Sequence, residues 1–221
     1  MAVNKNGADV TRPIYCVLEG IDGCGKDFQA NRLTEHLKSN GHNPLRINEP
    51  DEDFDTGKIL RNYLRSGLYR EAHAPLFLAN RMELLAYKVR PALDAGRPVV
   101  SSRSFLSTLV YQQENWPLPW LLDLHRQLPE RPSDIIVLDV DPEEAAKRRA
   151  TRGGYEEVYE KLEIQKRNRV RYRELMGVLP TFMRDPEDSR ASFIDGTGHK
   201  DVVWAQILDA LAPHIDLSVK V

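Results

Sequence analysis

The sequence has few cysteines, no excess of either charge and no long apolar run. It holds two cysteines in 221 residues, Cys16 in an apolar stretch and Cys24 in a glycine-rich turn. This excludes a disulfide framework and favours a reduced, cytoplasmic setting. A formal net charge of −2 gives no bulk attraction to nucleic acid or to an anionic membrane, and no apolar segment reaches the length of a membrane span. We therefore expect neither kind of partner, and we interpret residues 1–12 as a disordered N-terminus.

Apolar runs alternate with amphipathic stretches along residues 13–221, which we interpret as a single domain. This alternation predicts an α/β fold, a doubly wound parallel five-stranded sheet with helices on both faces. The expected strands are 14–19, 45–47, 98–101, 135–140 and 192–195. The expected helices are 26–40, 57–64, 75–95 with a break at Pro91, 104–113, 118–128, one starting at Asp141-Pro142, 156–179 and 201–211.

A predicted strand, a glycine-rich turn (GIDGCGK, residues 20–26) and a predicted helix follow one another near the start of the chain. The spacing alone also fits a tight turn, but the flanking elements favour a P-loop. In a P-loop, glycines let backbone N–H groups surround a polyphosphate, the helix N-terminus adds partial positive charge, and Lys26 reaches the phosphates. The turn therefore predicts binding of ATP by Gly20, Asp22, Gly23, Cys24, Gly25, Lys26, Asp27 and Phe28.

The last position of this motif departs from the usual P-loop. The full pattern ends in Ser or Thr, whose hydroxyl ligates Mg²⁺, whereas this chain carries Asp27. A carboxylate beside phosphates is repulsive unless a cation lies between them. Asp27 therefore predicts either a metal ion close by or a damaged site.

Several segments in order resemble the thymidylate kinase family. They are 18–23 (LEGIDG), 49–50 (EP), 76–81 (LFLANR), 102–103 (SR), 107–112 (STLVYQ) and 138–140 (LDV), within a similarity that covers residues 14–211. The resemblance implies a P-loop kinase that transfers a phosphoryl group from ATP to a deoxynucleoside monophosphate, dTMP or a related pyrimidine. It also implies Mg²⁺ as cofactor and a homodimer.

The resemblance implies roles for residues on the acceptor side. Phe77 would stack on the acceptor base and Arg81 would hydrogen-bond to it, and their i, i+4 spacing puts both on one helix face. By itself, Phe77 also fits a core aromatic. Arg103 would clamp phosphate with its forked guanidinium. The remaining implied acceptor contacts are Asp22, Glu49, Ser107, Tyr111, Gln112 and Tyr159.

An arginine-rich and glycine-rich segment, about residues 148–158, resembles the family's lid. It contains Arg148, Arg149 and Arg152, of which we favour Arg148 and Arg152 as the pair closing over the transferred phosphoryl group, with Arg148 also contacting ATP. The alternative is a solvated basic face paired with neighbouring glutamates. The expected catalytic set is Lys26, Arg103, Asp22, Arg148 and Arg152.

The chain departs from the family where a metal is expected. Asp27 replaces the P-loop hydroxyl, and Ser102 replaces an aspartate that usually precedes the clamping arginine. We hypothesise that Mg²⁺ is held by these exchanged ligands, since hard Mg²⁺ accepts either kind of oxygen. Asn48 and Val158 stand where arginines are common, which suggests a weaker or different acceptor.

Two other functions stay open at this stage. A deoxynucleoside kinase would need a general base for the nucleoside 5′-hydroxyl, and Glu49 at the end of the second strand fits that place. The altered metal positions also fit a nucleotide-binding protein without turnover.

Overall fold

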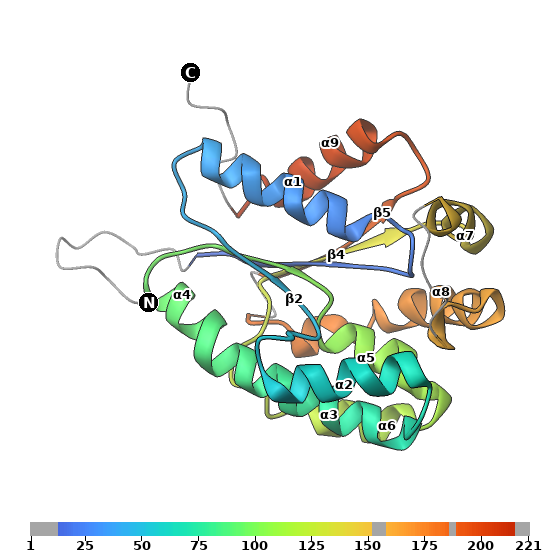
Figure 1. The fold of residues 1–221 in the computed structure, drawn as a ribbon. Coiled ribbons are helices and arrows are strands. Elements are labelled where there is room, and N and C mark those ends of the chain that lie inside the picture. Colours follow the sequence, from blue (N-terminus) through green and yellow to red (C-terminus); the bar gives the residue numbers. More distant parts are fainter. Residues whose placement is uncertain (1–12, 152–157, 186–188, 215–221) are drawn as a thin grey trace.

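Five parallel strands form one sheet in the computed structural model, which describes residues 13–151, 158–185 and 189–214 (Figure 1). The strand order is β2-β3-β1-β4-β5. The strands are β1 (Tyr15–Glu19), β2 (Leu45–Asn48), β3 (Val99–Ser102), β4 (Asp134–Asp139) and β5 (Arg190–Asp195). The predicted doubly wound parallel sheet is confirmed.

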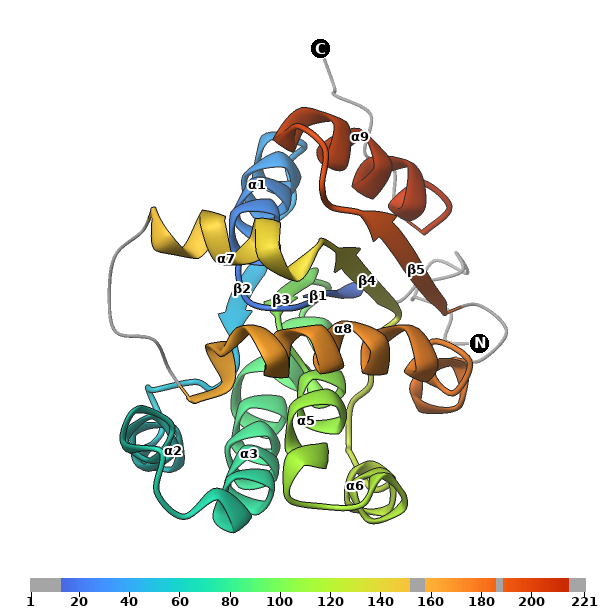
Figure 2. The same cartoon turned by 90° about the vertical axis from the view of Figure 1, so that its right-hand side faces the viewer.

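Helices cover both faces of this sheet (Figures 1 and 2). On one face lie α1 (Lys26–Ser39) and α9 (Lys200–Leu211). On the other face lie α2 (Asp55–Ser66), α3 (Arg70–Leu84), α4 (Arg90–Asp94), α5 (Phe105–Tyr111), α6 (Leu118–His125) and α8 (Leu162–Leu175), while α7 (Pro142–Ala150) follows the carboxyl end of β4. None of the described helices is long and apolar enough to cross a membrane.

The central strands β1 and β4 carry continuous apolar runs and are covered by helices on both faces. Cys16, Val17 and Leu18 of β1 are fully buried, and so is nearly all of β4. Burial on both faces explains why these strands appear in the sequence as continuous apolar runs without polar alternation. The edge strand β2 is shorter and more polar.

The register of the strands brings their carboxyl ends to one edge of the sheet. Leu18 of β1 and Asn48 of β2 both pair with Ser102 of β3. The segment that follows β3 therefore lies between the loop after β1 and the segment that follows β2. Ligands of open α/β sheets bind at this edge, where neighbouring crossovers run to opposite sides.

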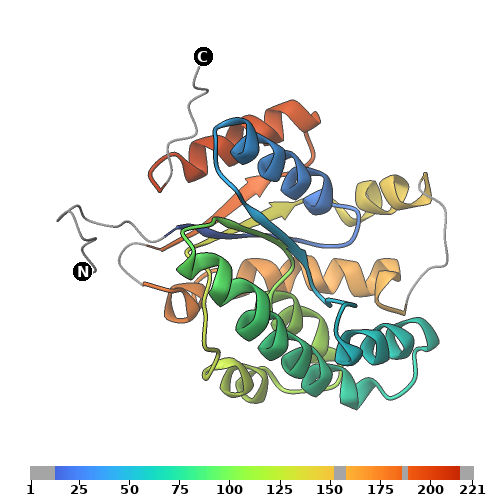
Figure 3. The same cartoon turned by 60° about the vertical axis from the view of Figure 1, so that its left-hand side comes forward.

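The helical run predicted for residues 75–95 differs from the structure at its start. It begins at Arg70 as α3, passes through a π-helical segment (Leu85–Val89) and ends as α4 (Figure 3). Pro75 lies inside α3 and has no N–H to donate to the carbonyl of Glu71, but the indole of Trp116 donates to that carbonyl at 3.0 Å. A contact distant in sequence thus allows a proline that local rules place at a helix start.

The helix predicted for residues 156–179 is shorter in the structure than expected. Helix α8 spans Leu162–Leu175, and a 3₁₀ turn at Val158–Glu160 precedes it. Residues 152–157, the middle of the predicted lid, lie outside the described residues, as does the predicted disordered start, 1–12. The predicted helix start at Asp141-Pro142 is confirmed, because the Asp141 side chain caps α7 by accepting from the amide of Glu143 at 2.9 Å.

Candidate active site

The loop between β1 and α1 depends on glycines with positive φ. Gly20 has φ 134° and Gly23 has φ 90°. A Cβ on Gly23 would lie 2.3 Å from the carbonyl oxygen of Ala145, and one on Gly20 would lie 2.6 Å from that of Leu138. Side chains are therefore excluded at both positions by backbone conformation and by the close approach of other main-chain segments. The P-loop predicted from the sequence has the backbone that such a motif requires.

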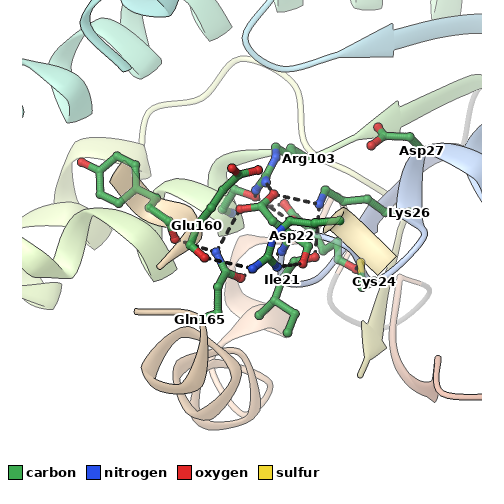
Figure 4. A network of polar contacts seen from close by, with 12 residues as sticks. Ile21, Asp22, Cys24, Lys26, Asp27, Arg103, Glu160 and Gln165 are labelled. Carbon is green, nitrogen blue, oxygen red and sulfur yellow. Dashed lines mark hydrogen bonds and ion pairs between the residues drawn. The ribbon is translucent and has the colours of Figure 1, made fainter. Parts of the chain in front are cut away.

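Asp22, inside this loop, lies at the centre of a polar network (Figure 4). One carboxylate oxygen pairs with Arg103 Nη2 and lies 3.5 Å from Lys26 Nζ. The other oxygen accepts hydrogen bonds from Tyr111 OH and Gln165 Nε2, both at 3.0 Å. Burial by itself raises the pKa of the Asp22 carboxyl, but the charges of Arg103 and Lys26 outweigh it and hold the pKa well below its usual range. Asp22 is therefore an anion that fixes two cations.

Lys26, the first residue of α1, turns its ammonium into the site and away from solvent. Its Nζ donates to the carbonyl of Ile21 at 3.3 Å and approaches Asp22, and the residue is only 4% exposed. The ammonium thus lies against the P-loop at the wall of a cavity. This position suits a lysine that binds phosphate oxygens.

Arg103 follows β3 in a left-handed backbone conformation, with φ 69°. A non-glycine residue in this region costs about 1–3 kcal/mol, and such residues cluster at functional sites. The guanidinium lies 5.0 Å from the ring centre of Tyr111, and its Nη1 donates to Ser107 Oγ at 3.0 Å. Together with Asp22, these partners hold the side chain beside the P-loop.

The carboxylate of Glu19, at the end of β1, is fully buried and is linked to Arg103 through Ser107. Its Oε1 accepts from Ser104 Oγ at 2.8 Å and from the amide of Ser107 at 3.2 Å. Its Oε2 accepts from Ser107 Oγ at 2.7 Å and from Tyr172 OH at 2.9 Å. Ser107 therefore donates its hydroxyl proton to Glu19 and accepts from Arg103, which links the clamp arginine to the core.

A cavity of about 420 Å³ opens beside Lys26 and Arg103, large enough for a small-molecule ligand. Every residue predicted to contact the acceptor lines it: Asp22, Glu49, Phe77, Arg81, Arg103, Ser107, Tyr111, Gln112 and Tyr159. Lys26, Asp27 and Ser102 line the same cavity. The walls also include Asn48, Arg61, Leu64, Ser104 and Glu160, which the sequence argument did not assign to it.

Arg81 is buried at the wall of this cavity with all three guanidinium nitrogens engaged. Nε donates to Glu49 Oε2 at 2.7 Å, Nη2 to Thr108 Oγ1 at 3.1 Å, and Nη1 to His125 Nε2 at 2.8 Å. Because arginine only donates, His125 Nε2 must be the unprotonated nitrogen, and Nδ1 donates to the carbonyl of Leu121 at 2.7 Å. Arg81 is thus fixed before any ligand binds, and its contact with the acceptor base stays a prediction.

His125 makes the stability of the fold depend on pH. Burial and then the charge of Arg81 lower its pKa to about 3, against about 6.5 in an unfolded chain. Between these values the unfolded state binds a proton that the folded state does not, so stability falls as the pH falls. From pH 7.5 to 5.5 we expect His125 alone to cost about 1.4 kcal/mol of unfolding free energy. Guanidinium chloride unfolding at both pH values measures this loss.

Substitution separates His125 from the other titrating groups. His125→Gln should lose about 1.4 kcal/mol less than the wild type between the two pH values, because glutamine does not titrate. His42→Gln, in the loop before β2, is the matched control and should keep the wild-type loss. An equal loss in His125→Gln and in the wild type would contradict the assignment.

A second cavity, of about 400 Å³, lies on the other side of the P-loop. Gly23, Cys24, Gly25 and Phe28 line it, as does Arg148, which places most of the residues predicted to bind ATP around one space. Residues 196 and 198–200, from the loop after β5 and the start of α9, complete the wall. Different residues of the P-loop therefore line two separate cavities.

Comparison with known proteins agrees with this geometry. A protein-family model described as thymidylate kinase matches residues 18–185. The chain belongs to the thymidylate kinase family. It is 35% identical over 178 residues to a probable thymidylate kinase of Thermococcus gammatolerans, which covers 76% of this chain and 85% of that protein. A probable thymidylate kinase of Methanosarcina acetivorans is 33% identical over 202 residues, 88% of this chain and 93% of that one. The thymidylate kinase of Leptospira borgpetersenii is 33% identical over 172 residues, 76% and 83% of the two chains.

Two of the three arginines of the predicted lid, Arg148 and Arg149, lie within the described residues. Arg148 bonds to Glu144 and to the carbonyls of Gly196 and Thr197, so in this thymidylate kinase fold it lies at the second cavity and does not line the one beside Arg103. Arg149, which the sequence argument did not favour, donates instead to the backbone carbonyl of Asp22 and, at 2.9 Å, to that of Glu160. Arg152 lies outside the described residues.

Asp27 and Ser102, the predicted Mg²⁺ ligands, lie together between α1 and β3. The Ser102 hydroxyl accepts from Arg46 Nη2 at 2.8 Å and lies close enough to the Asp27 carboxylate to help lower its pKa. Burial raises the pKa of Asp27, but the charge of Lys26 helps to hold it below its usual range, so the carboxylate is ionised. With 56% of its side chain exposed, Asp27 fits as a ligand for a hard cation, whereas the Ser102 hydroxyl already accepts a hydrogen bond from Arg46. Ser102 therefore fits better as the group that orients Asp27.

Proposed function

We propose that this kinase transfers the γ-phosphoryl group of ATP to dTMP and produces dTDP. The observation that carries the proposal is the placement of two cavities on opposite sides of the P-loop. One contains the residues expected around the acceptor, and the other contains most of those expected around ATP. The relatives named as thymidylate kinases support dTMP as the acceptor.

The chain's own residues bind and orient the two phosphates. Lys26 and Arg103 stand where charge spreads over the transferred group, and Asp22 holds both in place. Arg149, bonded to the Asp22 carbonyl, adds a third cation beside the P-loop. Such reactions depend on positioning and charge stabilisation and need no covalent enzyme intermediate.

We propose that Asp27 provides the protein carboxylate for Mg²⁺, with Ser102 as its hydrogen-bonded support. A bound Mg²⁺ would supply positive charge there that offsets the charge developing on the transferred group. We also propose a homodimer, because Ile59 of α2 and Met82 of α3 are exposed on helices that pack against each other.

The test is ADP release from ATP with a panel of acceptors, with and without Mg²⁺. We expect dTMP to be the best acceptor, thymidine to give no reaction, and removal of Mg²⁺ to abolish turnover. Faster reaction with thymidine than with dTMP would favour a deoxynucleoside kinase, with Glu49 as the base. Binding of ADP without turnover of any acceptor would favour a non-catalytic protein. The comparisons favour the monophosphate kinase over both.

A further inference from the structure

Arg46, in the edge strand β2, extends its guanidinium toward the start of α1 and the end of β3. Nε donates to Asn31 Oδ1 at 3.0 Å, Nη1 donates to the carbonyl of Ile47, and Nη2 donates to Ser102 Oγ at 2.8 Å. One rigid planar group therefore meets partners on three different elements. With 18% of its side chain exposed, the guanidinium is held in one position by the protein.

The same guanidinium lies next to the unusual carboxylate of the P-loop. Arg46 Nη2 is 3.9 Å from Asp27 Oδ1 and donates to the Ser102 hydroxyl beside it. In Figure 4 no dashed line joins the Asp27 carboxylate to Asp22, Lys26 or Arg103, although the charges of Lys26 and Arg103 also act on it.

The charge of Asp27 matters because of where it lies. Its side chain lines the acceptor cavity one residue after Lys26, where the proposed function brings phosphates. A carboxylate in that place repels a polyphosphate, and the repulsion is strong at the short distances of a partly buried site. A fixed guanidinium beside the carboxylate offsets this repulsion.

We propose that Arg46 is a positioning residue of the phosphate site. Together with Lys26 and Arg103 it offsets the charge of Asp27, so that the P-loop binds the phosphates of an adenine nucleotide even without a divalent ion. This inference rests on the proposed function. Arg46 acts through Asp27 and not by contact with the nucleotide, because its hydrogen bonds go to protein groups.

The test measures ADP binding by calorimetry in EDTA, which separates the effect of Arg46 from that of Mg²⁺. Arg46→Met should weaken ADP binding about tenfold. In the Asp27→Asn background the same substitution should weaken it by less than about twofold, because no carboxylate is left to neutralise. Arg46→Lys keeps the charge and should recover part of the loss. Arg97→Met is the matched control and should bind ADP like the wild type, since Arg97 bonds to the Asn43 carbonyl before β2 and does not line the cavity beside Lys26.

The outcomes separate this inference from the proposed function. A wild-type chain that binds no ADP with or without Mg²⁺ would contradict the proposed function. A wild-type chain that binds ADP only with Mg²⁺ would overturn the inference alone. So would an equal loss from Arg46→Met in the Asp27 and Asp27→Asn backgrounds, because Arg46 would then act independently of the carboxylate. Thermal unfolding of each variant identifies any loss of binding caused by misfolding. If Arg46→Met misfolds, the partial recovery expected of Arg46→Lys tests the inference in its place.

Discussion

Replacing Arg103 by methionine is expected to lower kcat for ADP release by at least about a thousandfold. Arg103 combines a fixed positive charge, a left-handed backbone and an ion pair with Asp22 beside Lys26. Methionine keeps most of the side-chain length but removes the charge on which a phosphoryl-transfer site depends. Arg103→Lys should recover only part of kcat, since an ammonium cannot fork onto Ser107 and phosphate at once. A coupled assay at saturating ATP and dTMP measures both variants.

A surface arginine provides the control for this substitution. Arg167 of α8 pairs with Glu114 and is half exposed, so Arg167→Met should change kcat by less than about twofold. The two variants lose the same charge and differ only in its position. A kcat of Arg103→Met within tenfold of the wild type would remove Arg103 from the catalytic set.

Replacing Glu19 by alanine is expected to cost about 3 kcal/mol or more of unfolding free energy. The carboxylate is fully buried and accepts four hydrogen bonds. Its removal leaves the hydroxyls of Ser104 and Tyr172 without their acceptor inside the core and opens a space where water is excluded. The substitution also removes the acceptor of the Ser107 hydroxyl, so Ser107 holds the Arg103 guanidinium less firmly. Equilibrium unfolding in guanidinium chloride measures the loss.

Two further variants test whether the hydrogen bonds of Glu19 cause this effect. Glu19→Gln keeps the shape and one accepting oxygen, and it should cost about half as much as the alanine. Glu35→Ala removes an exposed carboxylate paired with Lys38 on α1 and should cost less than about 0.5 kcal/mol. A similar small loss in Glu19→Ala would mean that the core tolerates its absence.

Much of the fold could be predicted from local patterns. The strands β1 and β4 are buried on both faces, so their apolar runs predict them from the sequence. The glycines at 20 and 23 mark a turn that excludes side chains. The residues predicted to contact the acceptor line one cavity, because the i, i+4 spacing of Phe77 and Arg81 places both on one face of α3 and the ends of parallel strands meet at one edge.

The missed residues depend on contacts that no local pattern contains. Arg148 and Arg149 are neighbours in sequence, and only the rotation of α7 against the P-loop decides that Arg149 meets Asp22. Gln165 and Tyr172 on α8 lie more than 140 residues from their partners in and before the P-loop. Arg46 was overlooked because a short edge strand gives no signal of where its side chain ends.

The side-chain amide of Gln165 joins α8 to the P-loop, both as an acceptor and as a donor of hydrogen bonds. Its oxygen accepts from the Asp22 backbone N–H at 3.0 Å, and its nitrogen donates to the Asp22 carboxylate at 3.0 Å and to the carbonyl of Tyr159 at 2.6 Å. The gap between the first turn of α8 and the P-loop is therefore set to the span of one glutamine. Any movement that brings the segment before α8 over the phosphates must either move the P-loop with it or first break the hydrogen bonds of Gln165.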